Sequence, residues 1–288
     1  MGAAGRLIGT NGIRLHVLEF GAGPTSILLH GFPEGSYAWE DLAVRIAHGG
    51  RRVLVPDQRG YNQSDKPPNI ASYDSETISR DVLGLIDASG SEHADLIGHD
   101  WGGHIAWWTA ARYPQRIRRL VVINAAHPRV MSRNILLNPR QTLKSYYIFV
   151  LQIPWIPEWI LSRNCFARML KQIRPNGSAI SSAEAERYIA AWSVPRAFPS
   201  MINWYRAAFR AFPFRLDEAR IRVPTLLIWG AQDQFLERSL AQQSIDWCDR
   251  GRVVYLEDAT HWVHHEQPEE VARLIVDFLA APDRGTLS

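Results

Sequence analysis

Asp100 is the residue of this 288-residue chain with the clearest chemical potential, and it lies in the segment Gly98-His99-Asp100-Trp101-Gly102. A short apolar run, 94–97, precedes it, and the Ala- and Trp-rich run 103–113 follows it with the spacing of a helix. A strand, a residue flanked by glycines and a helix are typical of a tight turn that holds one nucleophilic side chain up at the edge of a sheet. The glycines suit this turn because strand and helix approach too closely there for a Cβ atom. We therefore predict that Asp100 is a nucleophile.

The aspartate at this turn, where serine is more usual, decides the chemistry that we expect. An aspartate carboxyl, whose ordinary pKa is about 3.9, is already ionised at neutral pH, so it attacks without a general base. A histidine in the same site is then free to activate water in a later step. Such a site suits attack on a saturated carbon that bears a strained oxygen or a leaving group.

Two further candidates follow strand-like runs near the end of the chain. Asp233 comes after the apolar run 224–229, and His261 comes after the run 253–256. In an open α/β sheet, ligands bind beyond the carboxyl ends of the strands, so these side chains should meet Asp100 there. The order nucleophile, acid, histidine is that of a hydrolase triad, in which Asp233 would orient His261. Asn124 ends another strand but is not a carboxylate, so Asp233 is the better candidate for the acid.

Segments that read as strands and helices alternate through most of the chain. We predict a hairpin over 6–20, strands at 25–29, 52–56, 94–97, 120–124, 224–229 and 253–256, and helices at 39–47, 78–88, 103–113 and 268–279. The strand runs are continuously apolar, which is typical of parallel strands covered by helices on both faces. The sequence therefore predicts an α/β protein with a mostly parallel central sheet.

The pattern changes between residues 127 and 217. No β-branched strand run occurs in this segment, and the helical patches 183–192 and 200–212 lie among many Trp, Tyr, Phe, Arg and Pro residues. We predict a core domain formed by 1–126 and 218–288, with 127–217 inserted as a helical cap (lid) domain over the carboxyl edge of the sheet.

Composition and charge exclude several classes of protein. Hydrophobic residues make up 46% of the chain and charged residues 21%, which is ordinary for a globular protein. The formal net charge is +3 without a run of basic residues that could follow a phosphate backbone, so nucleic acid is not an expected partner. The most apolar stretch, 146–161, is interrupted by Gln152, Pro154, Pro157 and Glu158, so we expect no membrane span.

The cysteines and histidines indicate neither a metal site nor a disulfide framework. Cys165 and Cys248 have no zinc or disulfide spacing, and we expect packed thiols in a reducing compartment. With no apolar signal core among the first residues, we expect a cytoplasmic protein. No histidine–carboxylate cluster has metal-ligand spacing, so we expect no metal and no cofactor.

Five motifs follow one another along nearly the whole chain. They are His30-Gly31-Phe32-Pro33, Asp57-Gln58-Arg59-Gly60-Tyr61 with Ser64-Asp65-Lys66-Pro67, Gly98-His99-Asp100-Trp101-Gly102-Gly103, Gly230-Ala231-Gln232-Asp233 and His261-Trp262. Together they resemble the motifs of epoxide hydrolases of the α/β-hydrolase fold. The resemblance implies that fold, and it implies hydrolysis of a small apolar epoxide to a vicinal diol through an ester on Asp100. Water would be the second reactant, and the sequence does not indicate an oligomeric state.

The resemblance also implies two acids in the cap, because these epoxide hydrolases hold the epoxide oxygen with two tyrosines. Tyr147 fits the first position, with Tyr146 as the alternative if the register differs by one residue. Tyr205, in Asn203-Trp204-Tyr205-Arg206, fits the second position. A phenol with a pKa near 10 can donate a hydrogen bond and then a proton to a developing alkoxide at neutral pH. Without the resemblance, a pair of cap tyrosines would more often be packing residues.

The remaining roles that the resemblance implies fall on four aromatic residues. The backbone N–H groups of Phe32 and Trp101 would hold the oxyanion that forms when water attacks the ester. The side chains of Phe32, Trp101, Trp204 and Trp262 would contact the substrate. We also predict a cis peptide bond between Phe32 and Pro33, since X-Pro bonds are where cis is cheap.

Two other functions compete with epoxide hydrolysis. A haloalkane or haloacid dehalogenase would use the same nucleophile and histidine, with the Trp101 indole holding a halide. Against it, many haloalkane dehalogenases carry Asn or Glu where this chain has Phe32, and fluoroacetate dehalogenases carry arginines where it has Trp101 and His104. A non-catalytic receptor on this fold would not need a histidine that activates water.

The other histidines have structural interpretations. We expect His30 and His99 to brace tight turns through hydrogen bonds, His104 to be packed in its helix, and His264 and His265 to be ordinary polar residues of a loop or helix start.

Overall fold

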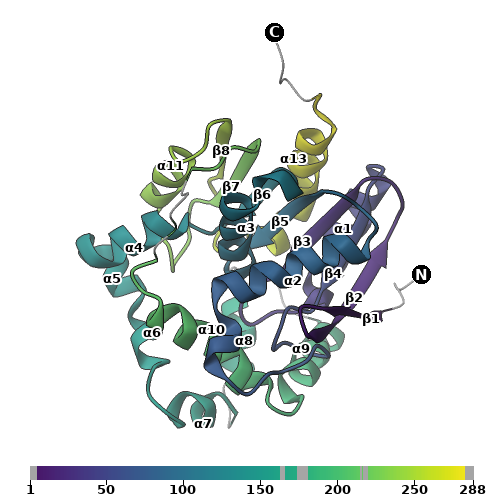
Figure 1. Cartoon of the computed structure of the whole chain (residues 1–288). Coiled ribbons are helices and arrows are strands. Elements are labelled where there is room, and N and C mark those ends of the chain that lie inside the picture. The colour runs from purple at the N-terminus through teal and green to yellow at the C-terminus, as the bar shows by residue number, and fades with distance from the viewer. Residues whose placement is uncertain (1–4, 163–165, 174–180, 215, 217–219, 283–288) are drawn as a thin grey trace.

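A central sheet of eight strands organises the part of the chain that the computed structural model describes, namely residues 5–162, 166–173, 181–214, 216 and 220–282 (Figure 1). The strands are β1 (Arg6–Thr10), β2 (Ile13–Phe20), β3 (Thr25–Leu29), β4 (Arg52–Pro56), β5 (Ala94–His99), β6 (Ile117–Ile123), β7 (Thr225–Gly230) and β8 (Gly251–Leu256). Their order in the sheet is β1-β2-β4-β3-β5-β6-β7-β8. The β1–β2 and β2–β4 pairs are antiparallel, and all the pairs from β4 through β8 are parallel. This is the mostly parallel sheet that the sequence predicts.

Helices cover both faces of the sheet because its central strands bury side chains on both sides. On β3, Ile27 and Leu29 belong to one core cluster and Leu28 belongs to the other. The first cluster includes residues of α2 (Ser75–Ala88), α3 (Trp101–Arg112) and α11 (Ser239–Ile245). The second includes residues of α1 (Glu40–His48) and α13 (Pro268–Ala280). The short helix α12 (Val263–Glu266) and 3₁₀ turns at Ser36–Trp39, Ile70–Tyr73 and Pro114–Arg116 complete this part.

Between β6 and β7 the described chain forms helices. They are α4 (Pro128–Leu137), α5 (Pro139–Lys144), α6 (Tyr146–Val150), α7 (Ile156–Ser162), α8 (Phe166–Ile173), α9 (Ser182–Ser193) and α10 (Ala197–Arg210). We call these seven helices the helical insertion. Figure 1 shows the insertion, teal to green, gathered at one side of the sheet. Helices α9 and α10 match the two helical patches that the sequence predicts.

Several local features agree with the sequence. The Phe32–Pro33 peptide bond is cis, as predicted, and a second cis bond joins Phe212 and Pro213. Cys248 is a buried free thiol, whereas Cys165 lies outside the described residues. Of the helices that the structure describes, none combines the length and the apolar character needed to cross a bilayer.

Candidate active site

The turn between β5 and α3 places Asp100 at the carboxyl edge of the sheet. Its backbone has φ 51° and ψ −119°, a conformation that non-glycine residues rarely adopt. A Cβ atom on Gly98 would come within 2.3 Å of the Gly102 carbonyl oxygen, and one on Gly102 within 2.1 Å of the Leu29 carbonyl oxygen. Both glycines are therefore required by close backbone approach, as the sequence predicts.

His261 lies between two carboxylates. Its Nδ1 atom is 2.7 Å from Oδ2 of Asp233, and its Nε2 atom is 3.5 Å from Oδ2 of Asp100. The His99 ring donates from Nε2 to the His261 carbonyl at 3.0 Å. This hydrogen bond holds the backbone of the loop that carries His261. The structure thus brings together the three residues that the chain order suggests.

Asp233 is held by donors that sequence reasoning does not assign. Asn124 donates from Nδ2 to Oδ2 of Asp233 at 2.7 Å, and its own Oδ1 accepts from the Gly230 N–H at 2.8 Å. The N–H groups of Phe235 and Leu236 donate to Oδ1 of Asp233 at 2.7 and 2.9 Å. From the sequence, Asn124 is considered only as an alternative position for the acid. Its place directly after a central strand is the signal for this positioning role.

Electrostatics keep the His261 ring protonated in the free protein. Burial by itself disfavours the protonated ring, but the Asp233 and Asp100 carboxylates outweigh it and raise the pKa of His261 to about 10. Burial also opposes ionisation of both carboxyls. The hydrogen bond and charge of His261 nevertheless hold the pKa of Asp100 and that of Asp233 below their ordinary value. At neutral pH the site therefore holds an imidazolium between two carboxylates.

A backbone donor faces the nucleophile. The Phe32 N–H donates to Oδ1 of Asp100 at 2.8 Å, and a Cβ atom on Gly31 would lie 2.4 Å from the Asp100 Cβ atom. Trp101 is the first residue of α3, where N–H groups have no partner within the helix. The Phe32 N–H therefore lies where an oxyanion site requires a donor, and the Trp101 N–H begins the helix directly after Asp100.

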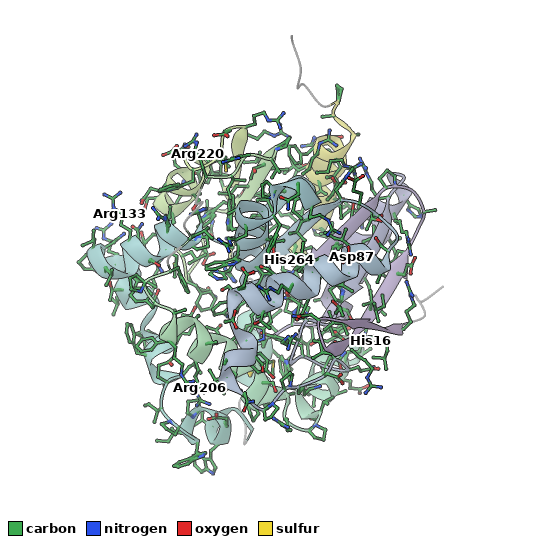
Figure 2. The ribbon with its side chains drawn as sticks, in the orientation of Figure 1. His16, Asp87, Arg133, Arg206, Arg220 and His264 are labelled. Carbon is green, nitrogen blue, oxygen red and sulfur yellow. The ribbon has the colours of Figure 1, made fainter. Side chains whose placement is uncertain are left out.

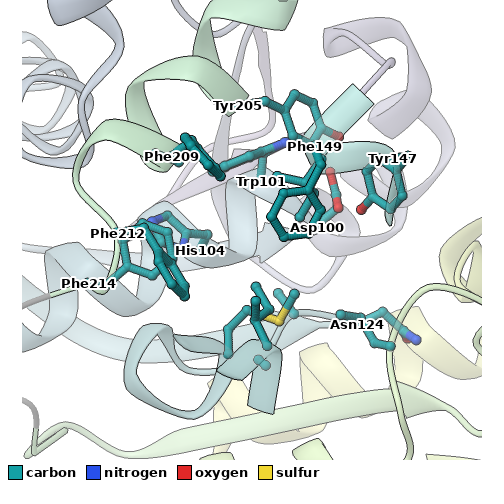
Figure 3. A pocket seen from close by; sticks show the side chains of 17 residues that line it. Asp100, Trp101, His104, Asn124, Tyr147, Phe149, Tyr205, Phe209, Phe212 and Phe214 are labelled. Carbon is teal, nitrogen blue, oxygen red and sulfur yellow. The ribbon is translucent and has the colours of Figure 1, made fainter. Parts of the chain in front are cut away.

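A cavity of about 120 Å³ opens above Asp100, and Tyr147 and Tyr205 line it. Figure 3 shows the oxygen atoms of both tyrosines turned toward Asp100. Tyr205 is buried, and the two rings lie 6.0 Å apart. Burial raises the pKa of Tyr147 and that of Tyr205, so both stay protonated donors. Tyr146 is 63% exposed and lies outside the cavity lining, so the structure selects Tyr147 of the two alternatives.

The remaining wall of the cavity is almost entirely apolar. Its aromatic part consists of Phe149, Phe209, Phe212 and Phe214, and Figure 3 shows the last three on the side away from Tyr147. Two polar residues, His104 and Asn124, also line the cavity. Burial lowers the pKa of His104 to about 4, and its Nε2 atom hydrogen-bonds the Ser75 hydroxyl at 2.9 Å. His104 is therefore packed, as predicted, but as a neutral wall of the cavity.

Three of the predicted substrate contacts are not among the residues that line this cavity. Trp204 is fully buried, and its indole N–H donates to the Arg59 carbonyl at 3.0 Å. Trp262 is buried against the His261 ring, with ring centres 5.1 Å apart. Neither indole lines the cavity, and neither does Phe32, whose ring packs on Tyr205 with centroids 5.4 Å apart. Of the four residues predicted to contact the substrate, Trp101 lines the cavity. The other three could not be placed from the sequence, because helical spacing does not reveal which aromatic residues face a cavity.

The interpretation of His264 and His265 as ordinary polar residues was wrong. His265 donates from Nε2 to Oε1 of Glu34 at 2.6 Å, and His264 donates from Nε2 to Oε2 at 3.2 Å. Tyr188 also donates to Oε1 at 3.0 Å. Because these partners are more than 150 positions from Glu34 in the chain, sequence spacing could not reveal the cluster.

Glu34, His99 and His264 are the described residues that could hold a metal ion, with ligand atoms within 4.8 Å of one another. Two imidazoles bound to one tetrahedral zinc ion would have ring centres about 5 Å apart. The rings of His99 and His264 are only 4.2 Å apart, and Glu34 already accepts three hydrogen bonds. This geometry fits a hydrogen-bonded cluster better than a metal site.

The sheet, the turn at Asp100 and the triad define an α/β hydrolase. The chain matches the α/β-hydrolase fold family over residues 26–268 and belongs to it. It is 42% identical over 280 residues to the AB hydrolase superfamily protein YfhM of Bacillus subtilis (strain 168), and the match covers 95% of this chain and 97% of that protein.

Further similarities place the chain among the epoxide hydrolases. It is 37% identical over 285 residues to epoxide hydrolase 4 of Homo sapiens, covering 95% of this chain and 78% of that one. An epoxide hydrolase from Bacillus megaterium, solved in complex with an inhibitor, superposes with a TM-score of 0.87 at 28% identity, covering 96% of this chain and all of the other. Within the α/β hydrolases, the chain belongs to the epoxide hydrolase family.

Proposed function

We propose that this protein hydrolyses an epoxide with a compact apolar substituent to a vicinal diol. The observation that carries the proposal is the pair of phenols, Tyr147 and Tyr205, which face Asp100 in an otherwise apolar cavity (Figure 3). An opening epoxide develops negative charge on oxygen, and neutral phenols are suited to receive that charge.

In the first half-reaction, Oδ2 of Asp100 attacks an epoxide carbon, while Oδ1 stays hydrogen-bonded to the Phe32 N–H. A C–O bond forms, and the C–O bond of the strained ring breaks. The alkoxide oxygen takes a proton from Tyr147 or Tyr205. His261, protonated in the free enzyme, is the source that restores the phenol proton. The product is a hydroxyalkyl ester of Asp100 with a neutral His261.

In the second half-reaction, the loss of the Asp100 charge converts His261 into a general base. The ester is neutral, so it no longer raises the pKa of His261, and Asp233 alone orients the ring. His261 takes a proton from water, and the hydroxide attacks Cγ of Asp100. The N–H groups of Phe32 and Trp101 hold the oxyanion. The Cγ–Oδ2 bond then breaks, and the leaving alkoxide takes the proton of the hydroxyl that was added to Cγ. The diol leaves, and Asp100 as a carboxylate and His261 as an imidazolium restore the starting state.

The dehalogenase alternative is not favoured by the site. Its halide would need the Trp101 indole, but that indole ring packs edge-to-face on the ring of Tyr205, with centroids 4.9 Å apart. A halide leaves without a proton, whereas an alkoxide needs one, and the two phenols beside the nucleophile can supply it. A non-catalytic receptor would not require the charged triad of Asp100, His261 and Asp233.

The size of the cavity limits the substrate. Its volume of about 120 Å³ is close to that of an apolar cavity of about 150 Å³ that holds one benzene ring. We infer that residues 127–217 act as a cap domain that closes over such a substrate, supported by Tyr147 of α6 and Tyr205 of α10. Epoxides with one compact aryl or alkyl group should be the best substrates.

A single turnover in ¹⁸O-labelled water tests the covalent mechanism with styrene oxide as the probe. Mass spectrometry should find the label in Asp100, because water attacks the carboxyl carbon. His261→Gln should accumulate the ester, since attack by Asp100 needs no base. Label that enters only the diol would overturn the proposal, as would faster bromide release from a bromoalkane than diol formation.

A further inference from the structure

The exposed apolar side chains of this protein are concentrated in one segment. Fourteen large apolar side chains are exposed in the described part of the chain, and eleven of them lie between Leu136 and Ile160. We call these eleven side chains the apolar face. Trp155 is 83% exposed, Leu143 73% and Trp159 59%. Large exposed apolar patches on soluble proteins mark sites of interaction with proteins or membranes.

The apolar face is continuous with the active-site cavity. Leu137, Leu143, Tyr146 and Phe149, from α4, α5 and α6, line one surface groove. The Phe149 ring packs on Phe209 at 5.9 Å, and both rings also line the cavity above Asp100. Figure 1 shows α5, α6 and α7 following one another along the outer side of the helical insertion.

Residues 127–217 and the rest of the chain carry net charges of opposite sign. Residues 127–217 contain 13 Lys and Arg against 4 Asp and Glu, a formal charge of +9, which leaves −6 for the rest of the chain. Arg133, Arg140 and Arg210 are exposed and form no ion pair with a described carboxylate. Figure 2 shows Arg133 extending away from α4 into solvent. Arg133 and Arg140 therefore add positive charge to α4 and α5, two of the helices that carry the apolar face.

We propose that the apolar face docks on an anionic lipid bilayer. Exposed Trp and aliphatic side chains insert at the headgroup level, while basic side chains beside them attract anionic lipids. The face would lie on the bilayer surface, and an apolar substrate dissolved in the lipid would meet Phe149 and Phe209 at the cavity.

A second copy of the chain and a nucleic acid fit the apolar face less well than a bilayer does. Two copies of the chain joined through this face would bring two segments of +9 together, which is repulsive at physiological ionic strength. A nucleic acid would bind the arginines, but it would leave the exposed apolar side chains of Trp155 and Leu143 without apolar contacts. These side chains therefore favour lipid as the occupant.

Flotation of the full-length protein with vesicles tests the proposal. The probes are vesicles of phosphatidylcholine with phosphatidylglycerol and vesicles of phosphatidylcholine alone. We expect the protein to float with the anionic vesicles and to be released by high salt. The double variants Trp155→Ser with Leu143→Ser, and Arg133→Glu with Arg140→Glu, should each reduce the bound fraction roughly tenfold or more.

The matched controls are exposed residues outside the helical insertion. Leu7, 53% exposed on β1, supplies Leu7→Ser, and the exposed Arg250 supplies Arg250→Glu. Both should bind vesicles like the wild type. All variants should hydrolyse a water-soluble epoxide at the wild-type rate without vesicles, so docking is measured separately from the reaction.

Three outcomes would overturn the proposal. The first is no flotation, or flotation that the face variants do not change. The second is equal flotation with neutral vesicles, which would remove the role of the basic side chains. The third is a concentration-dependent dimer in sedimentation that the Trp155→Ser variant disrupts, which would assign the face to a second copy.

Discussion

Neutralising Asp100 tests how this carboxylate controls the proton of His261. In Asp100→Asn, the side chain keeps its size but loses its charge, as it does in the ester. Two unit charges 3.5 Å apart interact by about 5 kcal/mol at an effective dielectric constant of about 20, equivalent to about 3.5 pKa units. We therefore expect the pKa of His261 to fall from about 10 toward the ordinary histidine value. The charge of Asp233, which is still present, keeps burial from lowering this pKa further.

Titration of ¹⁵N-labelled histidine by NMR gives the pKa of His261 in each variant. Asp87→Asn is the matched control, because Asp87 is an exposed acid paired with Arg116 far from the site. It should leave the titration of His261 unchanged. If His261 titrates at the same pH in Asp100→Asn as in the wild type, then charge loss at Asp100 does not make the histidine a base, and the two-step proton transfer fails.

Three further predictions concern the same site. Tyr205→Phe and Tyr147→Phe should each slow epoxide hydrolysis by roughly 10²–10³-fold, and the double variant should lose nearly all activity in a diol assay, with circular dichroism unchanged. Asn124→Ala should lower kcat more than it changes KM, because Asp233 loses one of its donors, and it should shift the pH profile of kcat; equal effects on both constants would contradict this role. The pKa of His261 is higher in the folded state than the ordinary histidine value of 6.5, so folding favours the protonated ring. That stabilisation, a few kcal/mol, is complete below pH ~6.5 and is lost as pH rises to ~10, so melting temperature should decline over this range in the wild type but less in His261→Gln.

The sequence by itself determined the elements and the order of the triad. The strands at 25–29 and 52–56 could be predicted because continuous apolar runs bounded by turn residues have few alternatives. Gly98 and Gly102 marked the turn at Asp100, because only a close backbone approach demands glycine on both sides of one residue. Asp233 and His261 followed from their places after strands, since parallel strands end at one edge of the sheet.

Only the tertiary structure decided which side chains meet across the chain. Trp204 and Tyr205 are neighbours on α10, yet one packs under the Arg59 loop and the other lines the cavity. Glu34 receives hydrogen bonds from His264, 230 residues away. A periodic pattern shows that a helix has a buried side, but the neighbour that buries it is set by how all the helices and strands pack together. Contacts of that kind have no local signature, so they belong to the fold and not to any segment of the sequence.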